Sequence, residues 1–284
     1  MIVRERVDLR DLDLRPTAEL VRLINAEDRT VAEAVSGAAE PIAAVIDAVV
    51  ERLEAGGRLV YVGAGTSGRL AAGDAAECGP TFSTDQVVAV TTEEEVAEDY
   101  AAAGASELAA IGVGPTDVVV GVSASGRTPY TLGALERAKE EGALTVALVC
   151  VGGSELARRA DHAIEVEAGP EVIAGSTRMK AGTAQKLVLN TISTISMVRL
   201  GKTFGNLMVD VQASNDKLRA RARRAVAVAT AAPEDEVAAA IAAADGDAKV
   251  AIVSLLTGVD AQTARSRLTA ARGVVREAVE DVVV

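Results

Sequence analysis

Five short apolar runs recur between residues 58 and 166, and helical patterns separate most of them. The runs are rich in Val, Leu and Ile, and they cover residues 58–62, 86–90, 117–122, 144–150 and 163–166. Helices are expected between them over 67–76, 93–111 and 129–142. Strands and helices that alternate at this spacing favour right-handed crossovers and a parallel sheet covered on both faces. The sequence therefore predicts an α/β fold with a parallel five-stranded sheet flanked by helices.

Further helical segments precede and follow this alternation. Apolar residues at helical spacing predict helices over 17–55, 177–199 and 208–230, and three shorter ones over 234–244, 247–257 and 261–280. The Pro-containing segment 231–235 separates the last three from the rest. We therefore expect one domain over 1–230 and a small three-helix C-terminal subdomain over 231–284.

Composition limits the classes of partner. Hydrophobic residues make up 49% of the 284 residues, which is enough for a large core, but aromatic residues make up only 2%. Proteins that bind single-stranded nucleic acid usually stack bases on aromatic rings, so this function is disfavoured. The net charge of −12 also disfavours nucleic acid and anionic membranes as partners. We expect a small molecule as the ligand.

The sequence has few residues that could bind a metal, and it lacks the pattern of a secretory signal. Cys78 and Cys150 are too few for a disulfide framework, and with the single His162 they give no metal-ligand spacing. The first residues are charged and lack the apolar core of a secretory signal, and no apolar run reaches the length of a membrane span. We expect a cytoplasmic protein without a metal.

The first strand-to-helix turn is rich in glycine and hydroxyl groups. Gly65, Thr66 and Ser67 follow the run 58–62 and open the next helix. Glycine lets the backbone approach a ligand closely, and amides and hydroxyls bind anionic oxygen. The turn lacks the lysine of a P-loop and fits the dinucleotide fingerprint poorly. Taken alone, it is most simply a helix start capped by Ser67.

A second turn has the same character after the run 117–122. Ser123, Ser125, Gly126 and Thr128 lie between that run and Pro129, which suits the first turn of a helix. One helix cap does not need three hydroxyls. We therefore interpret this turn as a cradle for an anionic oxygen.

A third segment combines hydroxyls with cations. Ser176, Thr177, Arg178 and Lys180 come directly before an apolar helix. A structural helix start needs only one capping hydroxyl, whereas this set suits an anion held at a helix N-terminus. Three such segments in one domain predict a bound phosphate.

Five motifs carry a resemblance to a known family. They are Gly63–Arg69, Asp74–Thr81, Ser123–Tyr130, Gly175–Asn190 and Gly201–Asp210. Together they resemble the N-acetylmuramic acid 6-phosphate etherases, which belong to the sugar isomerase (SIS) phosphosugar-binding family. The resemblance runs from about Pro16 to the C-terminus, and the motif at 175–190 is the most specific. It implies a SIS-type sheet, a phosphosugar as the partner, no cofactor, and a homodimer with sites near the interface.

The resemblance also implies a reaction and two catalytic carboxylates. Etherases of this family act in amino sugar catabolism and peptidoglycan recycling. They remove a D-lactyl ether from C3 of the sugar phosphate. This reaction needs a base to take the proton at C2 and an acid to protonate the leaving oxygen. The family's acid matches Glu77, and its base matches Glu98 within Ala97-Glu98-Asp99, although the two roles could be reversed. Without the resemblance, Glu98 would be a residue of an ordinary solvated helix face.

Two segments depart from the family pattern. The stretch between Glu77 and Glu98 is shorter than usual, and the charged arm Val3–Arg10 replaces the usual motif. Two other activities stay open for this fold: a phosphosugar-sensing regulator that binds without turnover, and an aldose-ketose isomerase. The two glutamates discriminate among them, because a pure binder needs neither and an isomerase needs no leaving-group acid.

Overall fold

The structure is a computed structural model that describes residues 6–92, 96–211 and 216–280. Contacts divide the chain into two compact units. The first comprises Met1–Ala76 and Gln86–Thr194, and the second comprises Glu77–Asp85 and Ile195–Val284. Each is described by itself.

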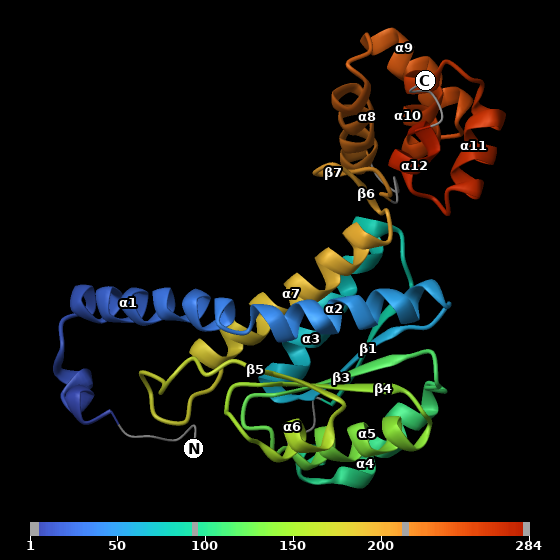
Figure 1. Ribbon diagram of the computed structural model, residues 1–284. Helices are drawn as coiled ribbons and strands as arrows, with labels where there is room; N and C mark the ends of the chain where they lie inside the picture. Colours follow the sequence, from blue (N-terminus) through green and yellow to red (C-terminus); the bar gives the residue numbers. More distant parts are fainter. Residues whose placement is uncertain (1–5, 93–95, 212–215, 281–284) are drawn as a thin grey trace. The chain divides into compact units, whose positions relative to one another are not determined.

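A parallel five-stranded sheet forms the centre of the first unit (Figure 1). Its strands are β1 (Leu59–Ala64), β2 (Val87–Thr92), β3 (Val118–Ser123), β4 (Leu144–Val149) and β5 (His162–Glu165), in the order β2-β1-β3-β4-β5. Every neighbouring pair is parallel. The predicted α/β fold with a parallel sheet is confirmed.

The strand order reverses beside β1. Gly63 pairs with Thr91 of β2 on one side and with Val122 of β3 on the other. The chain passes from β1 to β2 at one edge and then returns to place β3 at the opposite side of β1. Ligands of open α/β sheets bind at such a reversal, outside the carboxyl ends of the strands.

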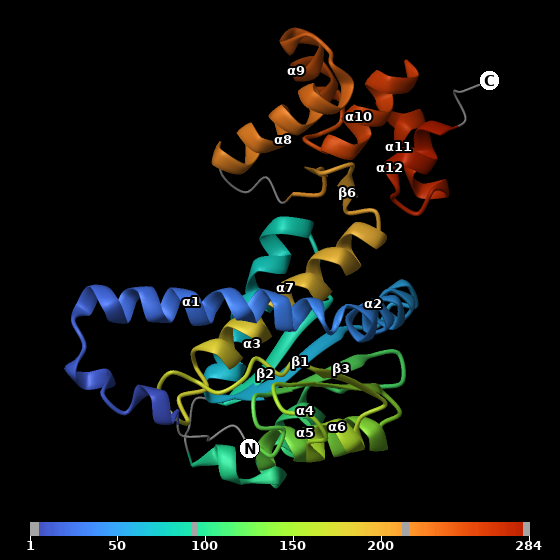
Figure 2. The same ribbon diagram turned by 60° about the vertical axis from the view of Figure 1, so that its left-hand side comes forward.

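Helices cover both faces of the sheet. One face carries α4 (Ala101–Ala110), α5 (Pro129–Glu140) and α6 (Glu155–Arg159), and the other carries α2 (Ala39–Glu54), α3 (Gly65–Phe82) and α7 (Lys180–Arg199), which Figures 1 and 2 show. Val60 and Val119 of the sheet pack with Leu108 of α4 and Tyr130 of α5 in one apolar core. The two central strands are buried along their whole length, which explains their continuous apolar runs.

The segment expected as one helix over 93–111 differs. Residues 93–95 lie outside the described residues, and Ala97–Asp99 form a short 3₁₀ turn, η3. Tyr100 has extended backbone angles, φ −112° and ψ 108°, and α4 begins only after it. The helical expectation for Glu98 was therefore wrong, because an extended residue interrupts the helix.

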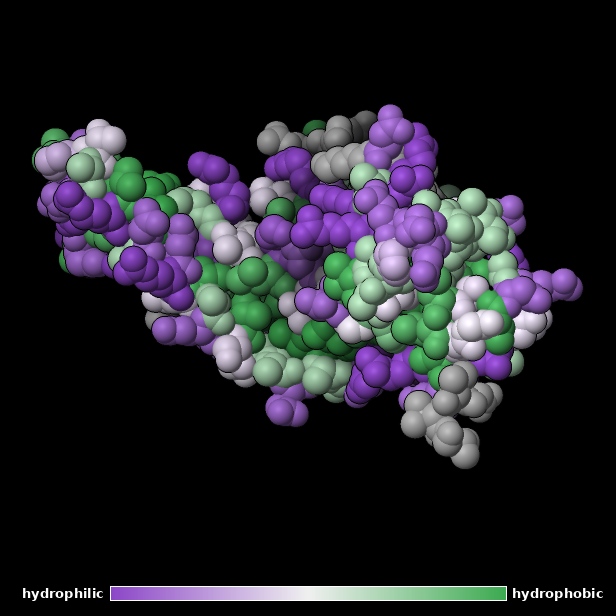
Figure 3. Space-filling view, turned by 90° about the horizontal axis from the view of Figure 1, so that it is seen from above, coloured by the Kyte–Doolittle hydropathy of each residue, from purple (hydrophilic) through white to green (hydrophobic). Residues whose placement is uncertain are grey.

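An N-terminal arm and a long helix precede the sheet. The arm forms two short 3₁₀ turns, η1 (Val7–Leu9) and η2 (Leu12–Leu14), and leads to α1 (Thr17–Ser36). Within the described residues, α1 buries only Val31 fully. Figure 3 shows apolar atoms among polar ones over the projecting part formed by α1, and Val21 is 54% exposed.

Helices and a small hairpin make up most of the second unit. The hairpin pairs β6 (Thr203–Phe204) with β7 (Leu207–Met208), and the helices are α8 (Asp216–Thr230), α9 (Glu234–Ala243), α10 (Ala248–Thr257), α11 (Ala261–Ala270) and α12 (Val275–Glu280). The helix expected over 208–230 begins instead at Asp216, and Met208 ends β7. The helix expected over 261–280 is split into α11 and α12 at Arg272 and Gly273, which both have positive φ. Helices α8 to α12 share one apolar core. The domain boundary expected after Thr230 stays a prediction.

No helix within the described ranges is long and apolar enough to cross a membrane.

Candidate functional site

The first glycine turn joins β1 to α3 beside the strand-order reversal. Gly65 has φ +56°, a conformation that favours glycine. A Cβ atom built on Gly68 would lie 2.5 Å from the carbonyl oxygen of Gly63, so only glycine lets the helix start this close to the strand. This geometry places Thr66 and Ser67, both half-buried, in the first turn of α3.

The third segment lies directly against this turn. The Ser67 hydroxyl donates to Oε1 of Gln185 on α7 at 3.0 Å. A Cβ atom built on Gly182 would lie 3.7 Å from the methyl carbon of Thr66. The structure therefore brings together two of the three segments singled out in the sequence.

The second turn is held by its own hydroxyl groups. Ser123 Oγ accepts from the Gly126 amide at 3.1 Å and lies 2.9 Å from Thr128 Oγ1. Gly126 has φ +59°, and a Cβ atom there would lie 2.3 Å from Ser154 Oγ. Ser123 is buried. Its contacts make it a support of the turn.

An anion could be received at the start of α5, which follows this turn. Thr128 is the N-cap residue but makes no side-chain cap bond, and Pro129 occupies the first turn. The first amides of a helix lack partners within the helix and attract negative charge. Ser125 is half-buried, and its Oγ accepts from the Arg127 amide at 3.3 Å. The hydrogen of the Ser125 hydroxyl can therefore be donated to a ligand.

The start of α7 differs from the expectation, because the protein fills it with its own anion. Glu171 Oε2 accepts from the Lys180 amide at 2.9 Å, and Oε1 accepts from the Ala181 amide at 3.0 Å. Glu171 is 2% exposed. These two amides are thus occupied by a buried carboxylate, and binding of an external anion by Ser176, Arg178 and Lys180 stays a prediction.

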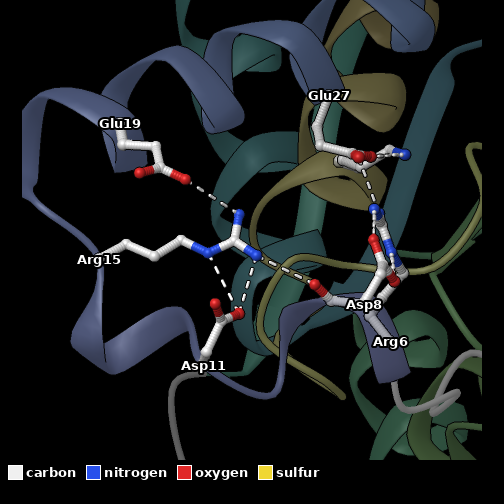
Figure 4. Close-up of polar contacts among 7 residues, drawn as sticks. Arg6, Asp8, Asp11, Arg15, Glu19 and Glu27 are labelled. Carbon is white, nitrogen blue, oxygen red and sulfur yellow. Dashed lines mark hydrogen bonds and ion pairs between the residues drawn. The ribbon is translucent and has the colours of Figure 1, made fainter.

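The charge of Lys180 is also met internally. Its Nζ donates to Glu27 Oε2 at 2.8 Å. Arg6 Nη1 donates to Glu27 Oε1 at 2.7 Å, as Figure 4 shows. Arg6 binds Asp8 as well. Burial raises the pKa of Glu27, but the hydrogen bonds from Lys180 and Arg6 outweigh it and hold this pKa below its ordinary value. The triad joins the arm, α1 and α7.

Two other predicted residues lie in the loop before α7. Ser176 is half-buried and donates its amide to the Ile173 carbonyl at 2.9 Å, whereas Arg178 is exposed. Neither has a described side-chain contact with the two glycine turns.

The two candidate catalytic carboxylates differ in burial and in the unit to which they belong. Glu98 is half-buried in η3, and a Cβ atom built on Gly65 would lie 3.4 Å from its Oε2. Glu98 therefore reaches the first glycine turn. Glu77 is an exposed residue of α3, and its contacts group it with the second unit.

Three residues of this region were missed by sequence reasoning. Gln185 lies within the third motif but carries no charge, Glu171 precedes that motif, and Glu27 lies among the ordinary charges of α1. Only the packing of α1, α3 and α7 assigns them partners. Among the described residues no group of three or more His, Cys, Asp or Glu side chains could hold a metal ion.

Comparisons with known proteins agree with the fold and the motifs. A family model described as the SIS domain matches residues 53–194. The solved structure of phosphoheptose isomerase from Neisseria gonorrhoeae is similar with a TM-score of 0.50 and 21% identity, over 64% of this chain and 98% of that one; at this identity the likeness shows the fold alone.

Relatives are similar over nearly the whole chain. A protein of Rubrobacter xylanophilus named N-acetylmuramic acid 6-phosphate etherase is 61% identical over 94% of this chain and 92% of its own length. A protein of the same name from Streptomyces avermitilis is 56% identical over 96% of this chain and 91% of its own length. Another from Geobacillus thermodenitrificans is 46% identical over 95% of this chain and 95% of its own length. The chain belongs to the N-acetylmuramic acid 6-phosphate etherase family of SIS-domain proteins.

Proposed function

We propose that this protein is a carbon-oxygen lyase that cleaves the D-lactyl ether of N-acetylmuramic acid 6-phosphate. The products are N-acetylglucosamine 6-phosphate and D-lactate. The observation that carries the proposal is the place of Glu98 beside the first glycine turn at the strand-order reversal. The uncapped start of α5 follows the neighbouring strand β3. Relatives of that name at 46% to 61% identity support the proposal.

The phosphate binds to hydroxyls and amides. Ser125 and Thr128 receive it at the start of α5, where Gly126 shapes the turn and its amide donates to Ser123. Ser67 and Thr66 with the Gly65 amide receive it at the start of α3. Ser123 holds the turn in shape through Gly126 and Thr128. Ser176 and Arg178 remain candidates for contact with the outer part of the substrate. Lys180 acts through Glu27, because its ammonium group is already paired.

The chemistry needs one base and one acid. With the sugar open as its aldehyde, Glu98 removes the C2 proton, the C3–O bond breaks, and Glu77 protonates the departing lactate oxygen. A C2=C3 double bond forms, and water then adds its hydroxyl at C3 while a proton returns to C2. General acid-base groups of this kind contribute about 10²–10⁴-fold each. Neither step needs a cofactor.

Two alternative functions share the phosphate site. A sensor that binds phosphosugars without turnover needs neither glutamate, and an aldose-ketose isomerase needs a base but no acid for a leaving group. The place of Glu98 beside Gly65 favours catalysis over sensing. The high identity to proteins named etherases favours the lyase over the isomerase.

The protein acts as a cytoplasmic homodimer in the recycling of cell-wall sugars. Helix α1 supports a second copy as the partner, because it buries only Val31 fully, leaves Leu20, Leu23 and Ile24 half-buried, and leaves Val21 54% exposed. Sedimentation velocity at two protein concentrations tests the dimer.

Release of D-lactate from the muramic acid phosphate by purified protein tests the activity. In heavy water, the product should carry deuterium at C2, because this carbon is deprotonated and then reprotonated. A product without solvent deuterium, or no release of lactate, would contradict the proposal.

A further inference from the structure

The side-chain amide of Gln185 has one partner where it could have several. Gln185 is 1% exposed on α7, and its Oε1 accepts from the Ser67 hydroxyl. Its Nε2 is also buried, and it has no hydrogen-bond partner within the part of the chain that the structure describes. A buried donor without an acceptor is costly, so it signals a role for the group.

The direction of this hydrogen bond decides what Ser67 can do. A hydroxyl has a single hydrogen, and here Ser67 gives it to Gln185. In this arrangement Ser67 has no hydrogen left for an anion. Half a turn of the amide about its last bond exchanges Oε1 and Nε2, which have nearly the same shape. Nε2 then donates to Ser67 Oγ, and the hydroxyl hydrogen becomes available.

We propose that Gln185 is a positioning residue that donates to Ser67 when a sugar phosphate is bound, so that the Ser67 hydroxyl donates to the phosphate. The inference rests on the proposed phosphosugar site. The exchange gives one of the two N–H groups of Nε2 an acceptor in Ser67 Oγ and leaves Oε1 under-satisfied, which proteins tolerate more often than an unpaired N–H group. Close packing of α7 on α3 at Gly182 keeps the amide beside Ser67 in both arrangements.

A double-mutant cycle tests this role. The variants are Gln185→Met, which keeps the length of the side chain without its amide, Ser67→Ala, and the two together. Asn190→Met is the matched control, because Asn190 is an exposed amide on the same helix. Calorimetry with N-acetylglucosamine 6-phosphate measures the dissociation constant of each variant, and thermal denaturation checks folding.

Gln185→Met should weaken binding about tenfold when Ser67 is present and less than twofold in the Ser67→Ala background, since the amide acts only through the hydroxyl. Asn190→Met should change the dissociation constant less than twofold. Equal losses in both backgrounds would mean that Gln185 supports the fold only, and no loss in either would also overturn the inference.

A further variant reports the direction of the hydrogen bond. Gln185→Glu introduces a carboxylate, which accepts and cannot donate, so Ser67 stays a donor to it. Gln185→Glu should weaken phosphosugar binding by a larger factor when Ser67 is present than in the Ser67→Ala background. In that background only the charge repulsion between Glu and the phosphate remains. Equal losses would contradict the proposed reversal. If the wild-type protein binds the phosphosugar but releases no lactate, the lyase proposal fails while the cycle still decides the role of Gln185. If it binds no phosphosugar, both fail.

Discussion

The ammonium group of Lys180 lies 2.8 Å from Glu27 Oε2, although 153 positions separate the two residues. Lys180 is 4% exposed, and the same carboxylate also binds Arg6 of the N-terminal arm. A cation of the motif Gly175–Asn190 thus joins α1 and the arm to α7. In the proposed site the phosphate therefore binds to hydroxyls and amides of the two glycine turns.

Glu27→Gln should loosen the N-terminal arm. The neutral amide cannot balance Arg6 and Lys180, and an unpaired buried charge is costly. We expect faster amide hydrogen exchange over residues 7–14 by about tenfold or more, measured by mass spectrometry. The control is Glu19→Gln, which removes an exposed charge beside Arg15 on the same helix. Unchanged exchange in Glu27→Gln would show that the arm is held by other contacts.

The same hydrogen bonds should respond to acid. The pKa of Glu27 lies below its ordinary value in the folded protein, so the interaction is fully present above about pH 4.5 and is lost as the pH falls through the folded-state pKa. Exchange of the arm should therefore accelerate below pH 4.5 in the wild-type protein, after correction for intrinsic rates. Glu27→Gln should lack this acceleration.

Ser125→Ala should weaken the binding of 6-phosphosugars and spare unphosphorylated sugars. A hydrogen bond to a charged group contributes roughly 1.5–3 kcal/mol, so the loss should be about tenfold or more. Calorimetry with the phosphorylated and unphosphorylated sugars measures it. Ser266→Ala, a change at an exposed serine of α11, is the control. Equal affinity before and after the change would limit Ser125 to its bond with the Arg127 amide.

Glu77→Gln and Glu98→Gln should each reduce lactate release by about 10²–10⁴-fold while phosphosugar binding stays nearly intact. Each removes a proton-transfer group without changing the size of the side chain. Glu236→Gln in the second unit and Glu51→Gln in the first are exposed controls. Near-full turnover in either variant would show that its glutamate is not catalytic.

Asp117→Asn should destabilise the first unit by about 3 kcal/mol, because it breaks a largely buried ion pair. Asp117 binds the Arg58 side chain and the amides of Arg58 and Gly114, which ties the starts of β1 and β3 together. Burial raises the pKa of Asp117, but these contacts lower it by a larger amount, so that the pKa lies below its ordinary value of 3.8. The stabilisation is therefore present at neutral pH and is lost as the pH falls through the folded-state pKa.

Urea denaturation at pH 7 and at pH 3 measures this contribution. The difference in the free energy of unfolding between the wild-type protein and Asp117→Asn should be smaller at pH 3 than at pH 7. Asp11→Asn removes the carboxylate of an exposed ion pair with Arg15 and should destabilise the protein much less than Asp117→Asn, because solvent screens exposed ion pairs. A gap that is independent of pH would mean that the charge of Asp117 does not stabilise the fold.

The five apolar runs predicted the five strands because buried parallel strands need continuous apolar residues on both faces. The second glycine turn was also predictable, since its hydroxyls and Gly126 interact within six residues of sequence. The 3₁₀ turn at Glu98 was not, because the local charges are equally compatible with a solvated helix, and only Tyr100 interrupts it. The split between α11 and α12 depends on positive φ at Arg272 as well as at Gly273, and an arginine does not signal such a conformation.

By itself, the sequence determined the strand-helix alternation, the glycine turns and the family, because these depend on local periodicity and on motifs of a few adjacent residues. Only the tertiary structure decided which anion each basic or amide group meets. The contacts of Glu27 with Lys180 and of Gln185 with Ser67 join segments 153 and 118 positions apart. Glu171 reaches the start of α7 from nine positions before Lys180, through a loop that has no regular periodicity. Electrostatic and hydrogen-bond partners are set by distance in space, and local sequence patterns carry no information on it.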